Sequence, residues 1–443
     1  MPFEEFAFST LDELIKAADA LNLELKFSKN LARLADKVRA GNITIPNSIA
    51  FHPMEGCDGN ADGSPGELTE RRYIRMAEGG AGLIWFEAVA VVPEGRAFTR
   101  QLCINEKNVD DYKRLHTQIV EKARAKFGDS FTPVCIMQLT HSGRFSKPQG
   151  TPEPIAACTN PYLDPLAKNS PIRVIRDEEL EALEEDYVKA AILAREAGFD
   201  GVDVKACHQY LNSELLAAHT RKGKYGETFE GRTRLLLNVV DRVRNALGKD
   251  FVIASRLNIY DGIPYPYGWG VDKEDFRKYD LSEPRKLVKE LQKKGVTLIN
   301  VTMGTPYYNP HVNRPYDKGG YIPEEHPLEG VARLLKGAAE IQKAVPEIAV
   351  VGTGYSWLRE FSPYLAAGTL EQGGASLIGF GREGFAYPCF AEDILKEKRM
   401  KKEKCCISCG KCAQLLRAGS TAGCVVRDAK IYAPVYKKCC ESR

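Results

Sequence analysis

The stretch IAVVGTG, residues 348–354, is an apolar run of strand length that ends in glycine, and SLIGFG, residues 376–381, repeats this design. Runs that are this short and apolar on both faces are typical of strands buried in a parallel sheet. The interval between the two runs is long enough for a helix. The pair therefore predicts a strand, a helix and a second, parallel strand.

Six earlier runs have the same character. They are NSIAFHP (47–53), GLIWFEAVAV (82–91), PVCIMQL (133–139), GVDVKA (201–206), FVIASRL (251–257) and TLINVTM (297–303). Helical patterns fill the intervals, most clearly at 177–198 and 231–248. Eight such strands alternating with helices predict an α/β fold, a TIM (β/α)8 barrel, with an open doubly wound sheet as the alternative.

The two ends of the chain differ from this repeat. Residues 1–41 carry helical patterning, in which apolar residues recur on one stripe after a Ser9–Thr10 start signal. The last 39 residues hold seven of the 13 cysteines. We therefore expect an N-terminal helical extension at 1–41, a barrel at 42–398 and a cysteine-rich segment at 399–443.

Composition limits the choice of partners and compartment. The 443 residues have a formal net charge of +3 without long blocks of one sign, which argues against nucleic acid or an anionic membrane as a partner. The first 30 residues have charges where a signal peptide needs an apolar stretch, and no run is long enough to span a membrane. We expect a cytoplasmic protein, in which an odd number of cysteines does not indicate a disulfide framework.

Two glycine-rich strand ends predict a phosphate-bearing ligand. In a TIM barrel the chemistry lies in the loops that follow the strands. Gly354 and Gly381 follow the last two runs and would let backbone N–H groups approach a phosphate, while Arg382 adds a bidentate cation. The alternative is that both glycines only form tight turns.

The fourth run ends in the strongest signal for a reaction. Lys205, His208 and Tyr210 lie within six residues, where a buried strand opens toward the expected active face. An alternative is structural, with Lys205 paired to Asp203 or another carboxylate. Other polar side chains at strand ends point to the same space and suit an electron-rich heterocycle: Gln138, His141, Arg144 and Arg256.

The segment CCISCGKCAQLLRAGSTAGC, residues 405–424, predicts a metal centre. Three thiolates with two-residue spacing and a fourth eleven residues later suit a 4Fe-4S cubane, whereas zinc more often takes two separated Cys-x2-Cys pairs. The expected ligands are Cys406, Cys409, Cys412 and Cys424. Cys405 is a spare or replaces Cys406, and Cys439 and Cys440 stay unassigned.

Residues 42–425 resemble the old yellow enzyme family. The motifs that carry the resemblance are HPMEG, AEGGAGLIWFEAVAV, QLTHSGR, AGFDGVDVKACHQYLNSELLA, YGETFEGRTR, LINVTMG and IGFGR, together with the cysteine cluster. The cysteines are similar to those of its iron–sulfur branch, which includes 2,4-dienoyl-CoA reductase, enoate reductases and trimethylamine dehydrogenase. The resemblance implies an FMN-binding barrel.

The resemblance also implies roles for residues around the flavin. At the first and second strands the flavin ring would be lined by Pro53, Met54, Glu55 and Ala88, where Glu55 departs from the family's usual threonine or cysteine. Gln138 would pair with the pyrimidine edge, and Arg256 would lie beside the flavin N1 and C2 carbonyl region. The phosphate cradle would be formed by Gly354, Gly381 and Arg382.

The family's activity implies how strand four works. Hydride transfer from FMN N5 would reduce an activated C=C bond of an α,β-unsaturated carbonyl or carboxylate, and Tyr210 would protonate the α carbon. Lys205 and His208 replace the family's His-x-x-His or His-x-x-Asn pair as donors to the activating oxygen. A lysine here favours an anionic or strongly polar activating group.

The electron source stays open, and so do three alternative functions of the protein. The chain ends 19 residues after Cys424 without a dinucleotide-binding fingerprint, so we expect electrons from NAD(P)H directly or from a separate reductase, ferredoxin or flavodoxin through the cluster. The sequence also leaves open whether the chain forms a homo-oligomer. The alternatives are an amine dehydrogenase or demethylase of the same fold, a phosphate-binding lyase with a Schiff base on Lys205, and a zinc-clipped interaction protein.

Overall fold

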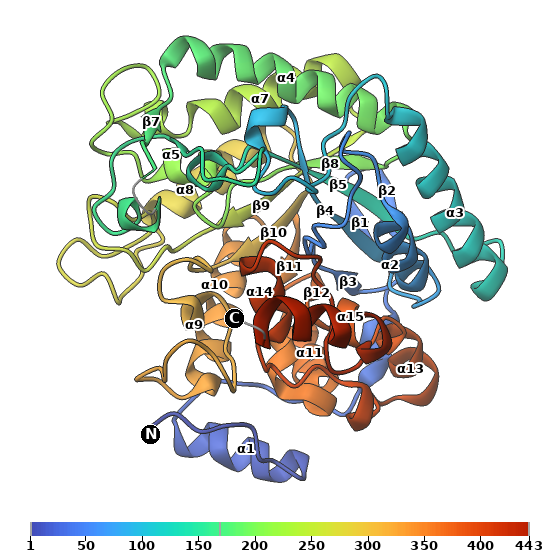
Figure 1. Ribbon diagram of the computed structural model, residues 1–443. Helices are drawn as coiled ribbons and strands as arrows, with labels where there is room; N and C mark the ends of the chain where they lie inside the picture. Colours follow the sequence, from blue (N-terminus) through green and yellow to red (C-terminus); the bar gives the residue numbers. More distant parts are fainter. Residues whose placement is uncertain (1, 168–169, 442–443) are drawn as a thin grey trace.

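A closed barrel of eight parallel strands forms the centre of the computed structural model, which describes residues 2–167 and 170–441 (Figure 1). The strands are β3 (Ile49–Phe51), β4 (Leu83–Ala90), β5 (Val134–Thr140), β8 (Gly201–Val204), β9 (Val252–Asn258), β10 (Leu298–Thr302), β11 (Ala349–Gly352) and β12 (Leu377–Phe380). Each coincides with one of the eight predicted runs, and β5 and β9 extend one residue beyond theirs. The predicted TIM barrel is confirmed.

Pairing of the last strand with the first closes the sheet and excludes the open doubly wound alternative. Ile378, Gly379 and Phe380 of β12 lie opposite residues 49–51 of β3. A Cβ atom on Gly379 would lie 2.1 Å from the His52 ring. Only glycine leaves room for that ring inside the barrel.

Helices surround the barrel (Figure 1). The longer ones are α2 (Glu67–Ala77), α3 (Val109–Phe127), α4 (Asp177–Glu196), α7 (Arg234–Leu247), α8 (Ser282–Lys293), α10 (Pro327–Ala344), α11 (Ser362–Glu371) and α13 (Phe390–Glu397). Helices α4 and α7 confirm the two helical patterns. Shorter ones are α5 (Leu211–Leu216), α6 (Phe229–Arg232), α9 (Pro310–Asn313) and α12 (Glu383–Ala386). Of the described helices, none is long and apolar enough to cross a membrane.

The N-terminal residues form a helix and then seal the barrel floor. Helix α1 (Leu11–Ala20) begins at a capping box, in which Thr10 Oγ1 accepts from the Glu13 amide, as the start signal predicts. An antiparallel hairpin follows, β1 (Val38–Ala40) with β2 (Ile43–Ile45). Ala40 and Ile45 pack among apolar side chains of the barrel strands. The hairpin spans the predicted boundary at residue 41. Elsewhere, β6 (Ile155–Ala156) pairs with β7 (Arg173–Val174).

The cysteine-rich segment folds as a small helical unit on the barrel. Helices α14 (Lys411–Arg417) and α15 (Ala429–Tyr436) pack through Leu415, Val425 and Tyr432. Asp428, ahead of α15, accepts hydrogen bonds from Arg71 at 2.7 Å and Arg75 at 2.8 Å. These bonds tie the unit, drawn in red in Figure 1, to α2.

A buried arginine organises the loop that follows β3. The Arg72 guanidinium on α2 donates to Asp58 at 2.6 and 2.9 Å and also pairs with Glu87 of β4. Glu87 in turn accepts the Gly56 amide at 2.9 Å. A Cβ atom on Gly56 would lie 2.2 Å from Arg72. The loop is therefore clamped between two carboxylates and one cation.

We expect Arg72→Met to lower the free energy of unfolding by about 3–5 kcal/mol, because it leaves two carboxylates buried without their cation. Chemical denaturation measures this change. The matched control is Arg114→Met, since Arg114 also pairs with two carboxylates but is half exposed; that substitution should cost at most about 1 kcal/mol. Equal losses in both variants would contradict a structural role for the Arg72 network.

Candidate active site

A cavity of about 660 Å³ opens at the C-terminal ends of the barrel strands. Its lining comes from the loops after β3, β4, β5, β8, β10, β11 and β12, from the strands themselves at Gln138 and Arg256, and from α14. Eleven of the twelve residues predicted to bind FMN or act on the substrate line it: Pro53, Met54, Glu55, Gln138, Lys205, His208, Tyr210, Arg256, Gly354, Gly381 and Arg382. Arg144 and Cys412 also line it. Ala88 is fully buried and is not part of the lining, and its carbonyl accepts from Gln101 Nε2.

Lys205 and Tyr210 share one carboxylate. Glu55 Oε1 lies 3.1 Å from Lys205 Nζ, and both Glu55 oxygens lie 3.3 Å from the Tyr210 hydroxyl. The ammonium also lies 3.7 Å from the centre of the Tyr210 ring. Lys205 thus pairs with a carboxylate, as the structural alternative expects, but the partner is Glu55 and not Asp203. The three side chains form one hydrogen-bonded group at the first and fourth strand ends.

The strained backbone of the turn after β8 directs these side chains toward the cavity. His208 and Gln209 have φ values of 65° and 58°, a left-handed conformation that costs free energy in residues other than glycine. The turn lets Lys205, His208 and Tyr210 all reach the cavity. Burial, with Arg256 and Lys205 nearby, lowers the pKa of His208 well below its usual range. The ring is therefore neutral at pH 7.

Asp203 builds the cavity floor instead of pairing with Lys205. Its buried carboxylate accepts from Gln138 Nε2 at 2.6 Å, from the Arg256 amide at 2.6 Å and from Trp85 Nε1 at 2.8 Å. Burial raises the pKa of Asp203, and these hydrogen bonds oppose that effect. The contacts fix Gln138 and the backbone of β9 at the cavity wall.

Two arginines make part of the cavity wall cationic. Gly354, with a φ of 111°, and Gly381 bring open backbone to the wall beside Arg382. Arg314, which sequence analysis missed, lies close enough to Arg382 that burial and this like charge lower the pKa of Arg314 to about 10. Within residues 2–167 and 170–441, Arg314 Nε and Arg382 Nη1 are buried without a hydrogen-bond partner. Two crowded guanidinium groups with free donors suit an anionic ligand.

A second, narrow cavity collects the predicted thiols. It is lined by Cys406, Cys409, Cys412 and Cys424, and it shares Arg382, Phe385 and Cys412 with the large cavity. Cys405 is not part of this lining; it is fully buried and its thiol lies 3.4 Å from the Lys401 carbonyl. The two neighbouring cysteines therefore face different surroundings.

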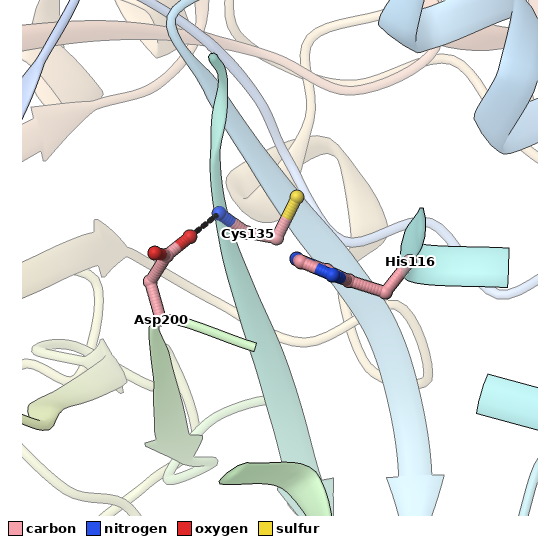
Figure 2. Close-up of side chains that lie close together, drawn as sticks. All are labelled: His116, Cys135 and Asp200. Carbon is pink, nitrogen blue, oxygen red and sulfur yellow. Dashed lines mark hydrogen bonds between the residues drawn. The ribbon is translucent and has the colours of Figure 1, made fainter. Parts of the chain in front are cut away.

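The cavity thiols are not drawn into a compact metal-binding group. In the part of the chain that the structure describes, only His116, Cys135 and Asp200 form a group of three or more possible ligand atoms within 4.8 Å of one another (Figure 2). No three of the cavity thiols do so. The 4Fe-4S cluster on these thiols stays a prediction.

The His116 group has a structural explanation. Cys135 and Asp200 lie at the N-terminal ends of β5 and β8, away from the large cavity. Asp200 accepts the Cys135 amide at 2.7 Å, and this bond joins the starts of the two strands (Figure 2). Burial lowers the pKa of His116 to about 4. The neutral ring packs against Phe199.

Comparison with known proteins identifies the family. Residues 36–401, which include most of the chain and the whole barrel, match the NADH:flavin oxidoreductase / NADH oxidase family. The chain belongs to this family. The resemblance to the old yellow enzyme family is thereby confirmed, whereas its iron–sulfur branch stays a prediction.

Two curated relatives cover nearly the whole chain. An NADH oxidase of Thermoanaerobacter brockii is 29% identical over 90% of this chain and 58% of its own length. A cinnamate reductase of Clostridium sporogenes is 26% identical over 89% and 57%. The chain thus spans somewhat more than half the length of these relatives. A solved 2-naphthoyl-CoA reductase shares the fold, with a TM-score of 0.72, 20% identity and coverage of 89% of this chain and 57% of that one.

The family implies FMN as cofactor and NAD(P)H as reductant, and the large cavity fits a flavin. Its lining offers buried polar atoms without partners among the described residues, including His208 Nε2, Arg256 Nε and Arg382 Nη1. Gln138 and Arg256 would hold the ring system. Gly354, Gly381 and the two crowded arginines would hold the phosphate.

We predict that Cys406→Ser abolishes cluster binding while Cys405→Ser preserves it. Of these two neighbouring cysteines, only Cys406 lines the thiol cavity. Iron and sulfide content after anaerobic reconstitution, with the sulfur-to-iron absorption band, measures the difference. Cys405→Ser is the control, since it removes the neighbouring thiol from the same loop. Full iron content in the Cys406 variant would instead support ligation by Cys405.

Proposed function

We propose that the protein is an FMN-dependent ene-reductase that reduces an activated C=C bond and carries a 4Fe-4S cluster on the four cavity thiols. The observation that supports this most is the convergence of Lys205, His208 and Tyr210 on a cavity that also holds Arg314 and Arg382, each with one buried N–H donor that lacks a partner among the described residues. Proton donors thus face a site with room for an anionic, ring-shaped cofactor. The relative named cinnamate reductase supports the same reaction class.

The chain's residues would supply orientation and a proton. When bound, FMN supplies the hydride that the β carbon of the substrate receives. Lys205 and the free Nε2 atom of His208 would hold the activating oxygen, on which negative charge develops. Tyr210 would donate its hydroxyl proton to the α carbon. Rings of Phe145 and Tyr307, stacked at 3.6 Å between centroids, line the same cavity and would suit a flat, conjugated substrate.

The ion pair with Glu55 changes the expected substrate preference. A free lysine would favour an anionic activating group, but the carboxylate 3.1 Å from Lys205 Nζ balances its charge. A neutral pair still offers N–H donors, yet it gives no net attraction for a carboxylate. We therefore expect neutral α,β-unsaturated carbonyl compounds to react faster than the corresponding carboxylates.

We predict that Tyr210→Phe lowers the turnover of cinnamaldehyde by about 10²-fold or more, because the proton donor is lost. Anaerobic assays with dithionite-reduced enzyme measure it by consumption of the enal. FMN content is the control and should match the wild type. Wild-type protein that oxidises amines but reduces no enal or enoate would instead support the amine dehydrogenase alternative.

Electrons would reach the flavin from NAD(P)H or from an acidic carrier protein that docks beside the cluster. Residues 399–443 contain 11 Lys and Arg against 3 Asp and Glu, a net charge of +8. Since the whole chain has +3, residues 1–398 carry −5. The thiols thus lie in a basic unit on an acidic barrel. Complementary charge speeds the docking of small acidic electron carriers.

We predict that reduction by an acidic ferredoxin slows with added salt, whereas reduction by NADH changes little. The variant Lys430→Glu/Lys438→Glu should lower the ferredoxin rate constant about tenfold at low ionic strength. Stopped-flow absorbance measures both rates. The control, Lys113→Glu/Lys122→Glu, makes the same charge change on exposed positions of α3. Equal slowing in both variants would contradict docking at the C-terminal unit.

A further inference from the structure

We propose that Glu55 is a proton relay that resupplies Tyr210 from Lys205 and solvent. The inference rests on the proposed ene-reduction, in which Tyr210 gives up a proton at every turnover. Glu55 was expected only to line the flavin. Its contacts in this structure assign it a further role, as a positioning and relay residue that acts through Tyr210.

The geometry of the three side chains carries this assignment. Glu55 Oε1 is within hydrogen-bonding distance of both Lys205 Nζ, at 3.1 Å, and the Tyr210 hydroxyl, at 3.3 Å. A proton can therefore pass between the two through one oxygen, without rotation of the carboxyl group. The Lys205 side chain is 1% exposed, whereas that of Glu55 is 13% exposed. Glu55 is thus the more accessible member of the ion pair.

Tyr210 needs a partner that returns a proton to its hydroxyl group. Burial and the Glu55 carboxylate raise the pKa of Tyr210 well above its usual range. A tyrosinate left beside a carboxylate would be unfavourable, so proton donation is easier when a second proton follows. The other groups whose pKa responds to the Glu55 charge are Tyr307, Cys57 and Cys207. Tyr307 also hydrogen-bonds Tyr210 and feels the charge of Arg417, whereas Glu55 is in direct contact with both Tyr210 and the ammonium of Lys205.

The step balances as a transfer of one proton along the group. As hydride adds to the β carbon, the Tyr210 O–H bond breaks, its electron pair stays on the phenolic oxygen, and the proton forms the new bond at the α carbon. Lys205 Nζ gives a proton to Glu55 Oε1, and this oxygen passes it to Tyr210. The Lys205 amine that remains regains its proton from cavity water through Glu55.

The loop that carries Glu55 is held firmly enough for this role. The next residue, Gly56, donates its amide to Glu87 at 2.9 Å and accepts the Ala422 amide at 2.7 Å. The first bond belongs to the Arg72 network, and the second comes from the cysteine-rich segment. Contacts from two parts of the chain thus fix the carboxylate relative to the end of β8.

The test is Glu55→Gln, which keeps the shape of the side chain but cannot carry a proton as a carboxylate does. We expect the rate of cinnamaldehyde reduction by the reduced enzyme to fall about 10²-fold. The solvent deuterium isotope effect on this step should rise, because reprotonation becomes rate-limiting. Glu55→Asp should restore part of the rate, since it retains an acid. FMN affinity, followed by flavin fluorescence, should stay within about twofold of the wild type.

The control is Glu153→Gln, an isosteric change at an exposed carboxylate next to Pro152 of the cavity lining. It should leave the rate and the isotope effect unchanged. A Glu55→Gln enzyme with wild-type rate and isotope effect, alongside an impaired Tyr210→Phe enzyme, would overturn the relay and leave the proposed reaction standing. Wild-type protein that reduces no enal or enoate would overturn the proposed function, and the relay with it.

Discussion

Closure of the sheet by β12 and β3 is the constraint on which the site depends. All eight strands are parallel, so their C-terminal ends meet at one rim. The β12–β3 pairing places the loop that carries Glu55 next to the turn that carries Arg382, although 327 positions separate these residues. The hairpin β1–β2 fills the other end. The chain therefore has one open end, where polar side chains can gather without exposing the core.

Charge is distributed unevenly over the cavity lining. The ammonium of Lys205 is balanced by Glu55. Arg314 and Arg382 crowd each other, and buried donors on both lack partners within the described residues. Burying like charges is costly unless an anion compensates them. An anionic group of a ligand would relieve this cost beside the two arginines.

The sequence predicts the barrel and much of the site, because both follow from local patterns. Eight apolar runs mark the strands, and polar residues at their ends mark the cavity. Contacts between distant residues leave no such pattern: Glu55 and Lys205 are 150 positions apart. Arg314 lies in a loop without periodicity. The two-residue spacing favours Cys406 over Cys405, and the fold shows that Cys406 is the one that lines the thiol cavity.

A single turn connects the two proposed cofactor sites. Arg382 lines both cavities. The next residue, Glu383, is buried and accepts the Cys406 amide with both oxygens, at 3.0 and 3.1 Å. Burial raises the pKa of Glu383 to about 8. Arg382 and Glu383 are neighbours at the start of α12, and one lines the large cavity while the other binds the Cys406 amide, so the backbone after β12 sets the distance between the two sites. The cysteine-rich segment is thus held in register with the barrel, which a short electron path would require.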